Sequence, residues 1–531
     1  MTARLKITAG WLALGIACKN DPVGTAPPVD AAATARCSGD ASGPDCLFDV
    51  AAISNDATLG LALDGPIAVT SVAGVMVAEV PFRFVGAPWH SQAWSHRASL
   101  FLPDPYGDAG WNAAAVYAEV NDDDGGDRPT AFVLDLFGRE TAARTRVPVA
   151  VFASAPPRPS VISTDGSVEN AAVKLAHPTV AGCFDVPLDE NPWKDCAWSI
   201  IDATLDWTWI PWTAIAASYL RTLHALTRLD ATWRAADAGL DIAVFAPTRF
   251  ATGGYSKRGI AQWYVAAMDA GVTAIWVGSG EWLSIQTMFQ SMIDDWGDDG
   301  GLRASYVAFY GTPLGDQFRG VVDPIKWASR LAGVAVTPLR GSDDEIWPQN
   351  HLSTYASAFP RLVAPGFVGD AMHVQRESGE YILTSAESVG SWRGVVARLR
   401  SADAVAPFVA TLDASFDLAA SPIRATATAT GADAGALVRV WWGSALDCTP
   451  PIGNVYDTFP AWGRDDRDMR DLSWTSLTMA KDGGVYFTDL PVGRDALPRD
   501  TQLFIDLLDS DSFASTIPLR LSDAGVDRSC P

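Results

Sequence analysis

The sequence predicts an α/β protein, in which a mostly parallel β-sheet carries helices on both faces and a smaller antiparallel β-sandwich follows it. Strand-like and helix-like patterns alternate over residues 211–339, which is typical of parallel crossover units. After about residue 405 a two-residue alternation replaces the helical periodicity. The chain has 531 residues, of which 48% are hydrophobic and 19% charged, so it can bury a large core and global disorder is excluded.

The elements of the first half follow from local patterns. Apolar runs of strand type, separated by turn-rich segments, are Val72–Val80, Ala98–Leu102, Ala113–Val120, Ala131–Leu136 and Val147–Ala153. Apolar residues at three- and four-residue spacing then predict an amphipathic helix over residues 211–238.

The second half continues the alternation and then changes character. The expected strands of the α/β part are Ile242–Phe245, Arg249–Thr252, Val272–Val277 and Val334–Leu339, and Lys257–Asp269 is expected to be helical. The expected strands of the sandwich are Ile423–Thr430, Leu437–Trp442, Val485–Phe487 and Leu503–Leu508.

The N-terminus has the pattern of a targeting segment. A short basic region precedes the apolar run Ile7–Ala17, which is too short to span a bilayer and ends at Cys18. This resembles a bacterial lipoprotein signal whose cysteine is lipidated, and ordinary cleavage is the alternative. We therefore expect a signal at 1–18, a flexible linker at 19–47, an α/β domain at 48–405 and a β-sandwich at 406–531. The expected location is the bacterial cell envelope or the medium, with no internal membrane span.

Cysteine usage agrees with export. Setting Cys18 aside leaves six cysteines, an even number in a compartment that permits disulfides. Pairing of sequence neighbours is the first expectation, and free buried cysteines are the alternative. The expected pairs are Cys37–Cys46, Cys183–Cys196 and Cys448–Cys530. The sequence lacks CxxC spacing, so no zinc site, other metal or cofactor is expected.

The charge balance limits the partners. Aspartate and glutamate number 62 against 39 lysines and arginines, a net charge of −23. Such a chain is poorly suited to bind phosphate backbones or anionic lipid headgroups. We expect no nucleic-acid partner, and membrane contact only through the lipid anchor.

One segment contains a candidate nucleophilic serine. Gly254-Tyr255-Ser256-Lys257-Arg258-Gly259 follows an apolar strand and precedes an amphipathic helix, which is the context of a nucleophile elbow. Such a turn presents the serine at a helix N-terminus, where backbone N–H groups, here that of Lys257, can stabilise an oxyanion. A glycine-rich turn with a capping serine is the alternative.

A serine nucleophile needs a histidine base and an orienting carboxylate, which in this context follow it in the order acid, then histidine. Of six histidines only His351 and His373 follow Ser256. His351 comes 7 residues after Asp344, too close for an intervening helix and strand, whereas His373 comes 29 residues after it. The predicted triad is Ser256, Asp344 and His373, with Asp343 as the competing acid.

Several motifs in order resemble the PhoPQ-activated pathogenicity-related proteins, a family with relatives of an autocrine proliferation repressor. They are the S-K-R-G of the elbow with Trp263, Trp94-Ser95-His96, Val322-Asp323-Pro324-Ile325-Lys326-Trp327, Asp344-Glu345-Ile346-Trp347, His373 and Arg467-Asp468-Met469-Arg470. The resemblance covers roughly residues 50–525. It implies an α/β-hydrolase-like fold and favours Asp344 over Asp343.

The function expected from these residues is hydrolysis of an ester or a peptide-like acyl bond in a small-molecule or peptide-like substrate. Candidate substrate contacts are Tyr255, Arg258, Trp207 and Trp209. Arg258 has the alternative of pairing with a buried carboxylate, and the tryptophans that of ordinary core packing.

The second oxyanion donor is expected near Asn121, but Asn121 is followed by three aspartates, which would disfavour a developing negative charge. The competing hypothesis is therefore a non-catalytic binding or signalling protein that keeps the hydrolase fold.

Overall fold

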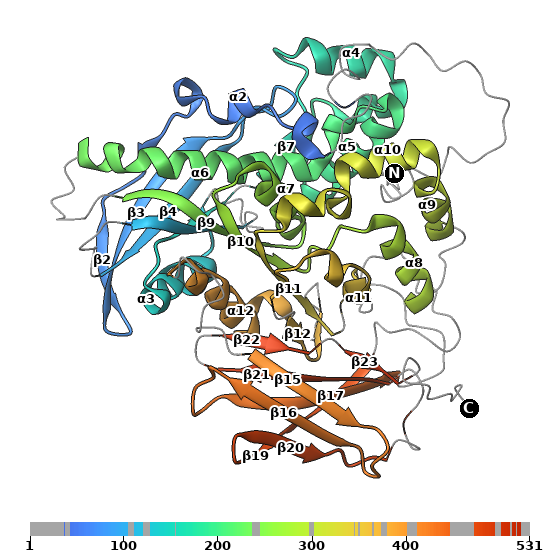
Figure 1. The fold of residues 1–531 in the computed structure, drawn as a ribbon. Helices are drawn as coiled ribbons and strands as arrows, with labels where there is room; N and C mark the ends of the chain where they lie inside the picture. Colours follow the sequence, from blue (N-terminus) through green and yellow to red (C-terminus); the bar gives the residue numbers. More distant parts are fainter. Residues whose placement is uncertain are drawn as a thin grey trace, which may run out of the picture.

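The protein has a helix-covered sheet and, at its C-terminal end, a pair of smaller sheets (Figure 1). The computed structural model describes residues 37, 43–104, 111–119, 128–153, 155–235, 245–296, 302–342, 344, 346–348, 351–363, 366–372, 380–400, 411–445, 472–493, 497, 501–509, 512–516 and 518–521. None of the helices within these ranges combines the length and the apolar character that a membrane crossing requires.

In the described residues the main sheet has ten strands, in the order β1-β3-β4-β6-β5-β9-β10-β11-β12, with β2 beside β3. The strands are β1 (Ala62–Leu63), β2 (Ala68–Val72), β3 (Val75–Val85), β4 (Ser95–Pro103), β5 (Trp111–Ala118), β6 (Val149–Phe152), β9 (Phe245–Tyr255), β10 (Val272–Gly278), β11 (Ala335–Gly341) and β12 (Gly366–Val368). Pairing is parallel from β6 to β12 and antiparallel from β1 to β4 and between β4 and β6. The mostly parallel sheet is thus the predicted one.

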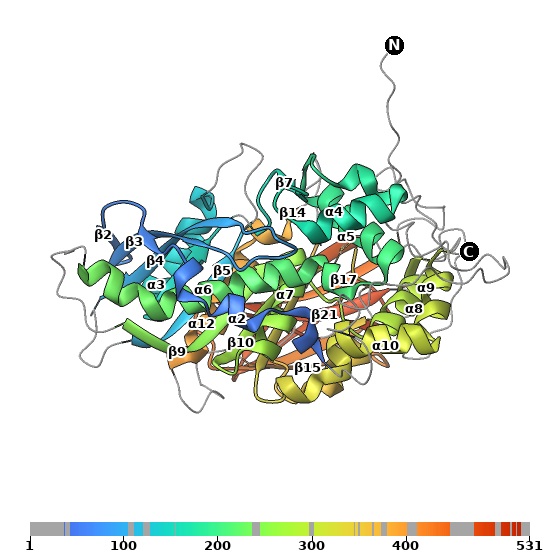
Figure 2. The ribbon, with the colours of Figure 1, turned by 90° about the horizontal axis from the view of Figure 1, so that it is seen from above.

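Helices cover both faces of this sheet, with α6 (Pro211–Ala235) and α7 (Lys257–Met268) on one side and α3 (Thr141–Thr145) and α12 (Ala386–Ala397) on the other (Figures 1 and 2). Successive strand residues alternate between the two layers. Ile275 belongs to the core beneath α6 and α7, and its neighbour Trp276 to the core beneath α12. Both faces are therefore apolar, as a parallel sheet between two helical layers requires.

Two groups of elements are inserted after parallel strands. After β6 come β7 (Ser160–Val161), α4 (Val168–Ala176), η5 (Pro178–Cys183), β8 (Pro187–Leu188), α5 (Glu190–Thr204) and η6 (Trp207–Trp209). After β10 come α8 (Ile285–Trp296), α9 (Leu302–Tyr310), α10 (Pro313–Val322) and η7 (Pro324–Leu331). The remaining short elements are η2 (Pro44–Leu47), α2 (Val50–Ile53), η3 (Asp56–Thr58), η4 (Val133–Glu140), α11 (His351–Tyr355), η8 (Ala356–Ala358), β13 (Ala371–Met372), β14 (Glu380–Tyr381), η9 (Ile382–Thr384) and η10 (Arg398–Arg400).

Two strand predictions differ from the structure. The run Val72–Val80 is not one strand, because Val72 ends β2 and β3 begins at Val75 after a turn. The run Ala131–Leu136 was expected to be a strand, but it enters η4, which has π-helical hydrogen bonding. Val133 and Phe137 are four residues apart and both fully buried, so the apolar spacing fits a helix packed on the sheet. The Thr130 hydroxyl oxygen accepts a hydrogen bond from the Val133 N–H, which would otherwise lack a partner at the start of the helix.

The predicted linker at 19–47 overlaps packed structure. Within it, η2 lies against the α/β domain, and the Gly43 N–H donates to the Gly320 carbonyl at 3.0 Å. The Cys37–Cys46 disulfide forms as expected, and so does Cys183–Cys196. Cys18, Cys448 and Cys530 lie outside the described residues.

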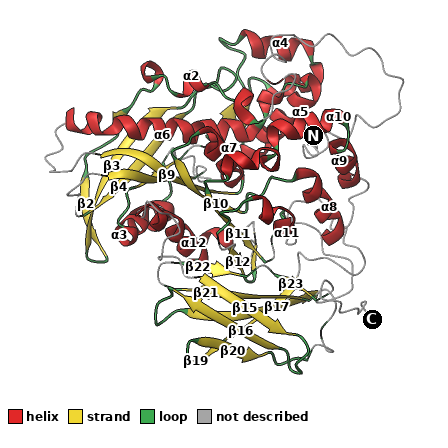
Figure 3. Ribbon diagram, viewed as in Figure 1, coloured by secondary structure: helices red, strands yellow, loops and turns green. Residues whose placement is uncertain are grey.

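Two antiparallel sheets form the C-terminal part, where the described residues are strands and turns (Figure 3). One holds β15 (Thr411–Asp417), β16 (Arg424–Thr430), β20 (Val485–Asp489) and β19 (Ala480–Asp482), and the other β18 (Leu472–Thr478), β17 (Leu437–Ala445), β21 (Gln502–Leu508), β22 (Phe513–Ser515) and β23 (Leu519–Arg520). Both contribute to one buried apolar cluster, as a sandwich requires. The Phe367 N–H of β12 donates to the Ser515 hydroxyl at 2.8 Å, which ties the sandwich to the main sheet.

Candidate active site

Ser256 stands at the junction of β9 and α7 in an unusual backbone conformation. Its φ is 56° and its ψ is −123°, on the positive-φ side that residues with a side chain rarely adopt. Its N–H donates to the Gly278 carbonyl of β10 at 2.7 Å. Such strain persists only where the surroundings enforce it, and it is typical of functional turns.

The glycines beside Ser256 allow this tight turn. A Cβ on Gly254 would lie 2.5 Å from the Tyr219 hydroxyl, and one on Gly259 would lie 2.7 Å from the Gly278 carbonyl oxygen. The Tyr219 hydroxyl donates to the Gly253 carbonyl at 2.6 Å and accepts the Ala118 N–H at 3.2 Å. The glycines therefore let α6, α7 and β10 approach the elbow closely, and Lys257 becomes the first residue of α7, where N–H groups lack helical partners.

The strands that precede the candidate residues end at one edge of the sheet. Tyr255 of β9 and Leu339 of β11 both pair with Gly278 of β10, and Gly341 of β11 pairs with Val368 of β12. The residues that follow these strands are therefore neighbours at the carboxyl edge, where α/β proteins place their ligands.

Asp344 belongs to the loop that follows β11 at this edge. It is 2% exposed, and its Oδ1 accepts the N–H groups of Ile346 and Trp347, both at 2.9 Å. The Trp347 indole donates to the carbonyl of Ser279, the residue directly after β10. The carboxylate is thus held in a fixed orientation next to the strand that separates it from the elbow.

A buried ion pair supports the same loop. Arg340 of β11 and Glu281 are both fully buried and bonded to each other, and Arg340 also donates to the Pro348 carbonyl. Because a buried charge without a partner is costly, this pair fixes the path of the chain around Asp344.

The other predicted residues of the machinery lie outside the described residues. These are His373, the competing acid Asp343 and the expected donor Asn121. His351, the second histidine after the elbow, is buried at the start of α11. Its Nε2 lies 2.8 Å from the Leu283 carbonyl oxygen, and burial lowers its pKa to about 3.

The sheet order and the strand–serine–helix turn are those of the α/β-hydrolase fold. The family model of the PhoPQ-activated pathogenicity-related proteins matches residues 76–385, more than half of the chain. The chain belongs to this family. No curated protein sequence matches it.

Three solved structures illustrate the partial likeness to other proteins. A glucuronoyl esterase from Teredinibacter turnerae is 15% identical, with a TM-score of 0.30 over 58% of this chain and 67% of that one. A glucuronoyl esterase from Solibacter usitatus is 13% identical, with a TM-score of 0.31 over 58% and 74%. Acetyl xylan esterase 1 from Thermoanaerobacterium sp. is 11% identical, with a TM-score of 0.30 over 66% and 95%.

In this PhoPQ-related chain the two cations of the elbow contact Glu190, the first residue of α5. The Glu190 carboxylate lies 2.7 Å from Arg258 Nη1, 2.7 Å from Arg158 Nη2 and 3.4 Å from Lys257 Nζ. Burial alone would raise the pKa of Glu190, but the three cations outweigh it and lower that pKa. Arg258 is 6% exposed, so the structure shows the pairing with a buried carboxylate that the sequence left as an alternative.

Lys257 keeps part of its side chain accessible. Its Nζ donates to Asn191 Oδ1 at 2.7 Å, and burial lowers its pKa to about 8. The side chain is thus directed to the start of α5, while its backbone N–H remains at the N-terminus of α7.

The three aromatic candidates for substrate contact differ in how deeply they are buried. Trp209 is fully buried and stacks on the His90 ring with centroids 3.6 Å apart, and Tyr255 is 6% exposed. Trp207 is half-buried and meets the Phe318 ring edge-on at 5.6 Å. Trp207 is therefore the most accessible of the three aromatic rings.

Sequence analysis assigned no role to three supporting residues, Glu190, Tyr219 and Asp323. Glu190 and Tyr219 are distant in sequence from the elbow, and Tyr219 merely fitted the apolar stripe of its helix. Asp323 lies in the V-D-P motif and accepts the Ser284 and Ile285 N–H groups, so it fixes the start of α8. Burial raises the pKa of Asp323 to about 6.

Proposed function

We propose that this protein is a serine hydrolase that cleaves an ester or a peptide-like acyl bond, with Ser256 as nucleophile, His373 as base and Asp344 as the orienting acid. The observation that carries the proposal is the positive-φ backbone of Ser256 between β9 and α7. A strained turn at this junction lifts the serine hydroxyl out of the sheet edge. The support from Asp344 is its buried, oriented carboxylate after β11.

In the proposed reaction, His373 takes the proton of the Ser256 hydroxyl as its oxygen attacks the carbonyl carbon. The oxyanion of the tetrahedral intermediate accepts N–H bonds from Lys257 and from the segment around Asn121. His373 then returns the proton to the leaving group, and a water molecule, activated in the same way, hydrolyses the acyl-enzyme. The partial positive charge at the N-terminus of α7 favours the oxyanion.

The proposed partner is a small-molecule or peptide-like substrate rather than a nucleic acid. Trp207 is the best-placed candidate among the aromatic rings for an apolar contact, because part of it remains accessible. Arg258 is proposed to support the elbow through its ion pair with Glu190 rather than to contact the substrate. Trp209 is proposed to pack against His90 in the inserted region, because its ring is fully buried there.

A fluorophosphonate probe tests the activity, because it phosphonylates activated serines. We expect the purified protein to be labelled and Ser256→Ala to be unlabelled. Ser91→Ala is the matched control, because Ser91 is exposed and also has a positive φ, of 64°. Absence of labelling in the folded wild-type protein would instead favour a non-catalytic binding or signalling protein, as the aspartates after Asn121 suggest.

We further propose that the protein is exported and anchored by lipid on Cys18. The two disulfides support export, because such bonds persist in oxidising compartments. Two acyl chains, each contributing about 0.8 kcal/mol per buried CH₂, would give stable anchoring. Mass spectrometry of the mature N-terminus tests this, and an unmodified N-terminus beyond Cys18 would refute anchoring.

A further inference from the structure

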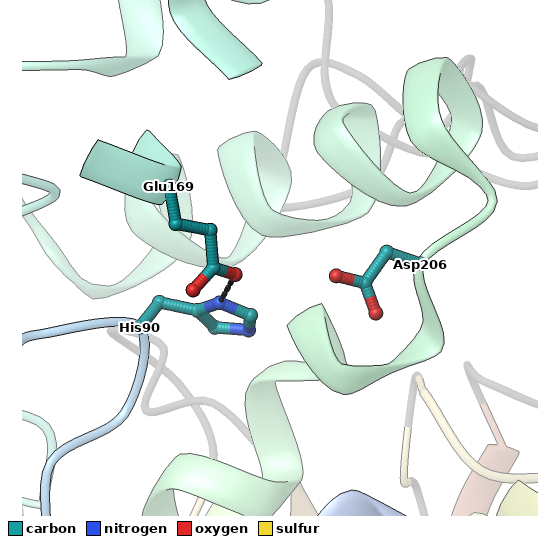
Figure 4. Close-up of side chains that lie close together, drawn as sticks. All are labelled: His90, Glu169 and Asp206. Atoms are coloured by element: carbon teal, nitrogen blue, oxygen red, sulfur yellow. Dashed lines mark hydrogen bonds and ion pairs between the residues drawn. The ribbon is translucent and has the colours of Figure 1, made fainter. Parts of the chain in front are cut away.

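Three side chains from separate segments, none of them part of the elbow, lie close together (Figure 4). His90 lies in the loop between β3 and β4, Glu169 in the first turn of α4, and Asp206 at the start of η6. One potential ligand atom of each lies within 4.8 Å of the other two, and His90 Nδ1 is 2.8 Å from Glu169 Oε1. We propose that these residues bind a divalent transition-metal ion, with Zn²⁺ as the ion that fits their chemistry.

The donor set favours this class of ion. Imidazole nitrogen and carboxylate oxygen are both zinc ligands, with bonds of about 2.0–2.2 Å, whereas Ca²⁺ takes six to eight oxygens and Mg²⁺ prefers oxygen alone. Tetrahedral zinc would set its donors about 3.3 Å apart, so small side-chain rotations would bring the three atoms into its coordination sphere.

The surroundings orient the proposed ligands. The His90 ring stacks on Trp209 at 3.6 Å with an interplanar angle of 8°, and the His90 carbonyl accepts Asn170 Nδ2 at 2.9 Å. Asp206 Oδ1 accepts the Thr208 N–H at 3.0 Å and the Thr208 hydroxyl at 2.6 Å. Within the part of the chain that the structure describes, no group donates to Asp206 Oδ2, which leaves that oxygen for the ion. Neighbours that fix ligand orientation in this way are typical of metal sites.

The charge and the solvent accessibility of this cluster both favour a bound dication. Two carboxylates flank a single imidazole, and a dication would offset their repulsion. The side chains of His90 and Glu169 are 6% and 51% exposed, so the site opens to solvent on the Glu169 side and leaves room for a water ligand. The ion would join α4 and η6 to the β3–β4 loop, in the same inserted region that the Cys183–Cys196 disulfide constrains.

Calorimetric titration of the full-length protein with ZnCl₂, after removal of bound metal with a chelator, tests the proposal. We expect one Zn²⁺ per chain, with the affinity at least 10-fold weaker in Glu169→Gln and in His90→Gln. Glu169 is half-exposed, so its variant is expected to fold normally. His224→Gln is the control, because His224 and Asp56 form another histidine–carboxylate pair, at 2.6 Å.

X-ray absorption of the zinc-loaded protein gives an independent measurement. We expect one imidazole nitrogen and otherwise oxygen ligands at about 2.0–2.2 Å. No binding, unchanged affinity in either variant, equal weakening in the control, or sulfur ligation would each overturn the proposal.

Discussion

At the level of single residues, Ser256 has a strained backbone conformation with a positive φ. Alanine and glycine at this position both remove the hydroxyl, but glycine adopts a positive φ without steric cost. Such strain typically costs about 1–3 kcal/mol, and the extra freedom of glycine in the unfolded chain offsets part of the gain. We therefore expect Ser256→Gly to be about 1 kcal/mol more stable to unfolding than Ser256→Ala, as measured by chemical denaturation. An alanine variant as stable as the glycine variant would show that the turn is not strained.

His96, in the W-S-H motif, is a second residue whose environment sets its chemistry. It is fully buried with its Nδ1 3.0 Å from the Ala153 carbonyl oxygen, and burial lowers its pKa from 6.5 to about 4. The unfolded chain therefore binds a proton below pH 6.5 that the folded protein does not bind until about pH 4. The stability that the neutral ring contributes is present above pH 6.5 and is lost as the pH falls through this window.

His96→Asn removes the titrating ring and can keep a donor toward Ala153. We expect the unfolding free energy of the wild type minus that of the variant to fall as the pH is lowered. The expected decrease is about 1.4 kcal/mol per pH unit between pH 6 and pH 4.5. Denaturation curves at several pH values measure the difference. If the unfolding free energies of the two proteins changed with pH in the same way, this would contradict the lowered pKa of His96.

At the scale of elements, the elbow depends on close approach of α6, α7 and β9. Gly254→Ala would place a methyl group 2.5 Å from the Tyr219 hydroxyl and 2.6 Å from Arg258 Cβ. We expect a loss of about 1–3 kcal/mol of stability from this overpacking, together with loss of probe labelling. Gly182→Ala is the control, because a Cβ there meets nothing within 4 Å. Equal stability of the two variants would contradict the close packing at Gly254.

Glu190 connects α5 to the elbow, and its neutralisation would remove the carboxylate that three cations share. We expect Glu190→Gln to destabilise the protein by about 3–5 kcal/mol. Asp489→Asn breaks the exposed pair with Arg424 and is expected to change the stability much less, because solvent screens that pair. Thermal and chemical denaturation of both variants measure the contrast, and similar losses would show that burial of the Glu190 pair is unimportant.

The sequence predicted the elements best where periodicity and turn signals agreed. The elbow strand and helix appear within a few residues of the expected bounds, as β9 and α7. The error at Ala131–Leu136 arose because a short apolar run fits a strand or a helix equally well, and packing against the sheet decides between them. Glu190 and the His90 cluster were not found, because their members come together only through the fold.

At the scale of the whole molecule, the β-sandwich packs against the main domain through a well-defined apolar contact. Phe513 of β22 is 2% exposed and lies beside Gly366 of β12 and Gly390 of α12. Across the same junction Arg439 contacts Glu387 at 2.8 Å. These contacts indicate that the two parts stabilise each other.

Phe513→Ala tests this coupling. We expect a loss of about 3–5 kcal/mol, with the sandwich and the α/β domain still unfolding together. Phe487→Ala, on the outer sheet and 38% exposed, is expected to cost much less. Calorimetry follows both variants, and an unaltered transition in Phe513→Ala would mean that the sandwich is only loosely attached.

Within the described residues, the division into a mostly parallel sheet and later antiparallel sheets was predictable, because the two sequence patterns have different periods. The contact between these sheets and the main sheet was not predictable. Phe513 and Gly366 are far apart in sequence, and no motif around either residue indicates that they pack together.

If Ser256, Asp344 and His373 act as one unit, mass-spectrometric mapping of the fluorophosphonate adduct will show it most directly. We expect one adduct on the peptide that contains Ser256, and a labelling rate at least 100-fold lower in His373→Asn and clearly lower in Asp344→Asn, because base and acid activate the serine together. An adduct on another serine, or labelling of Ser256 that is unchanged in both variants, would contradict it.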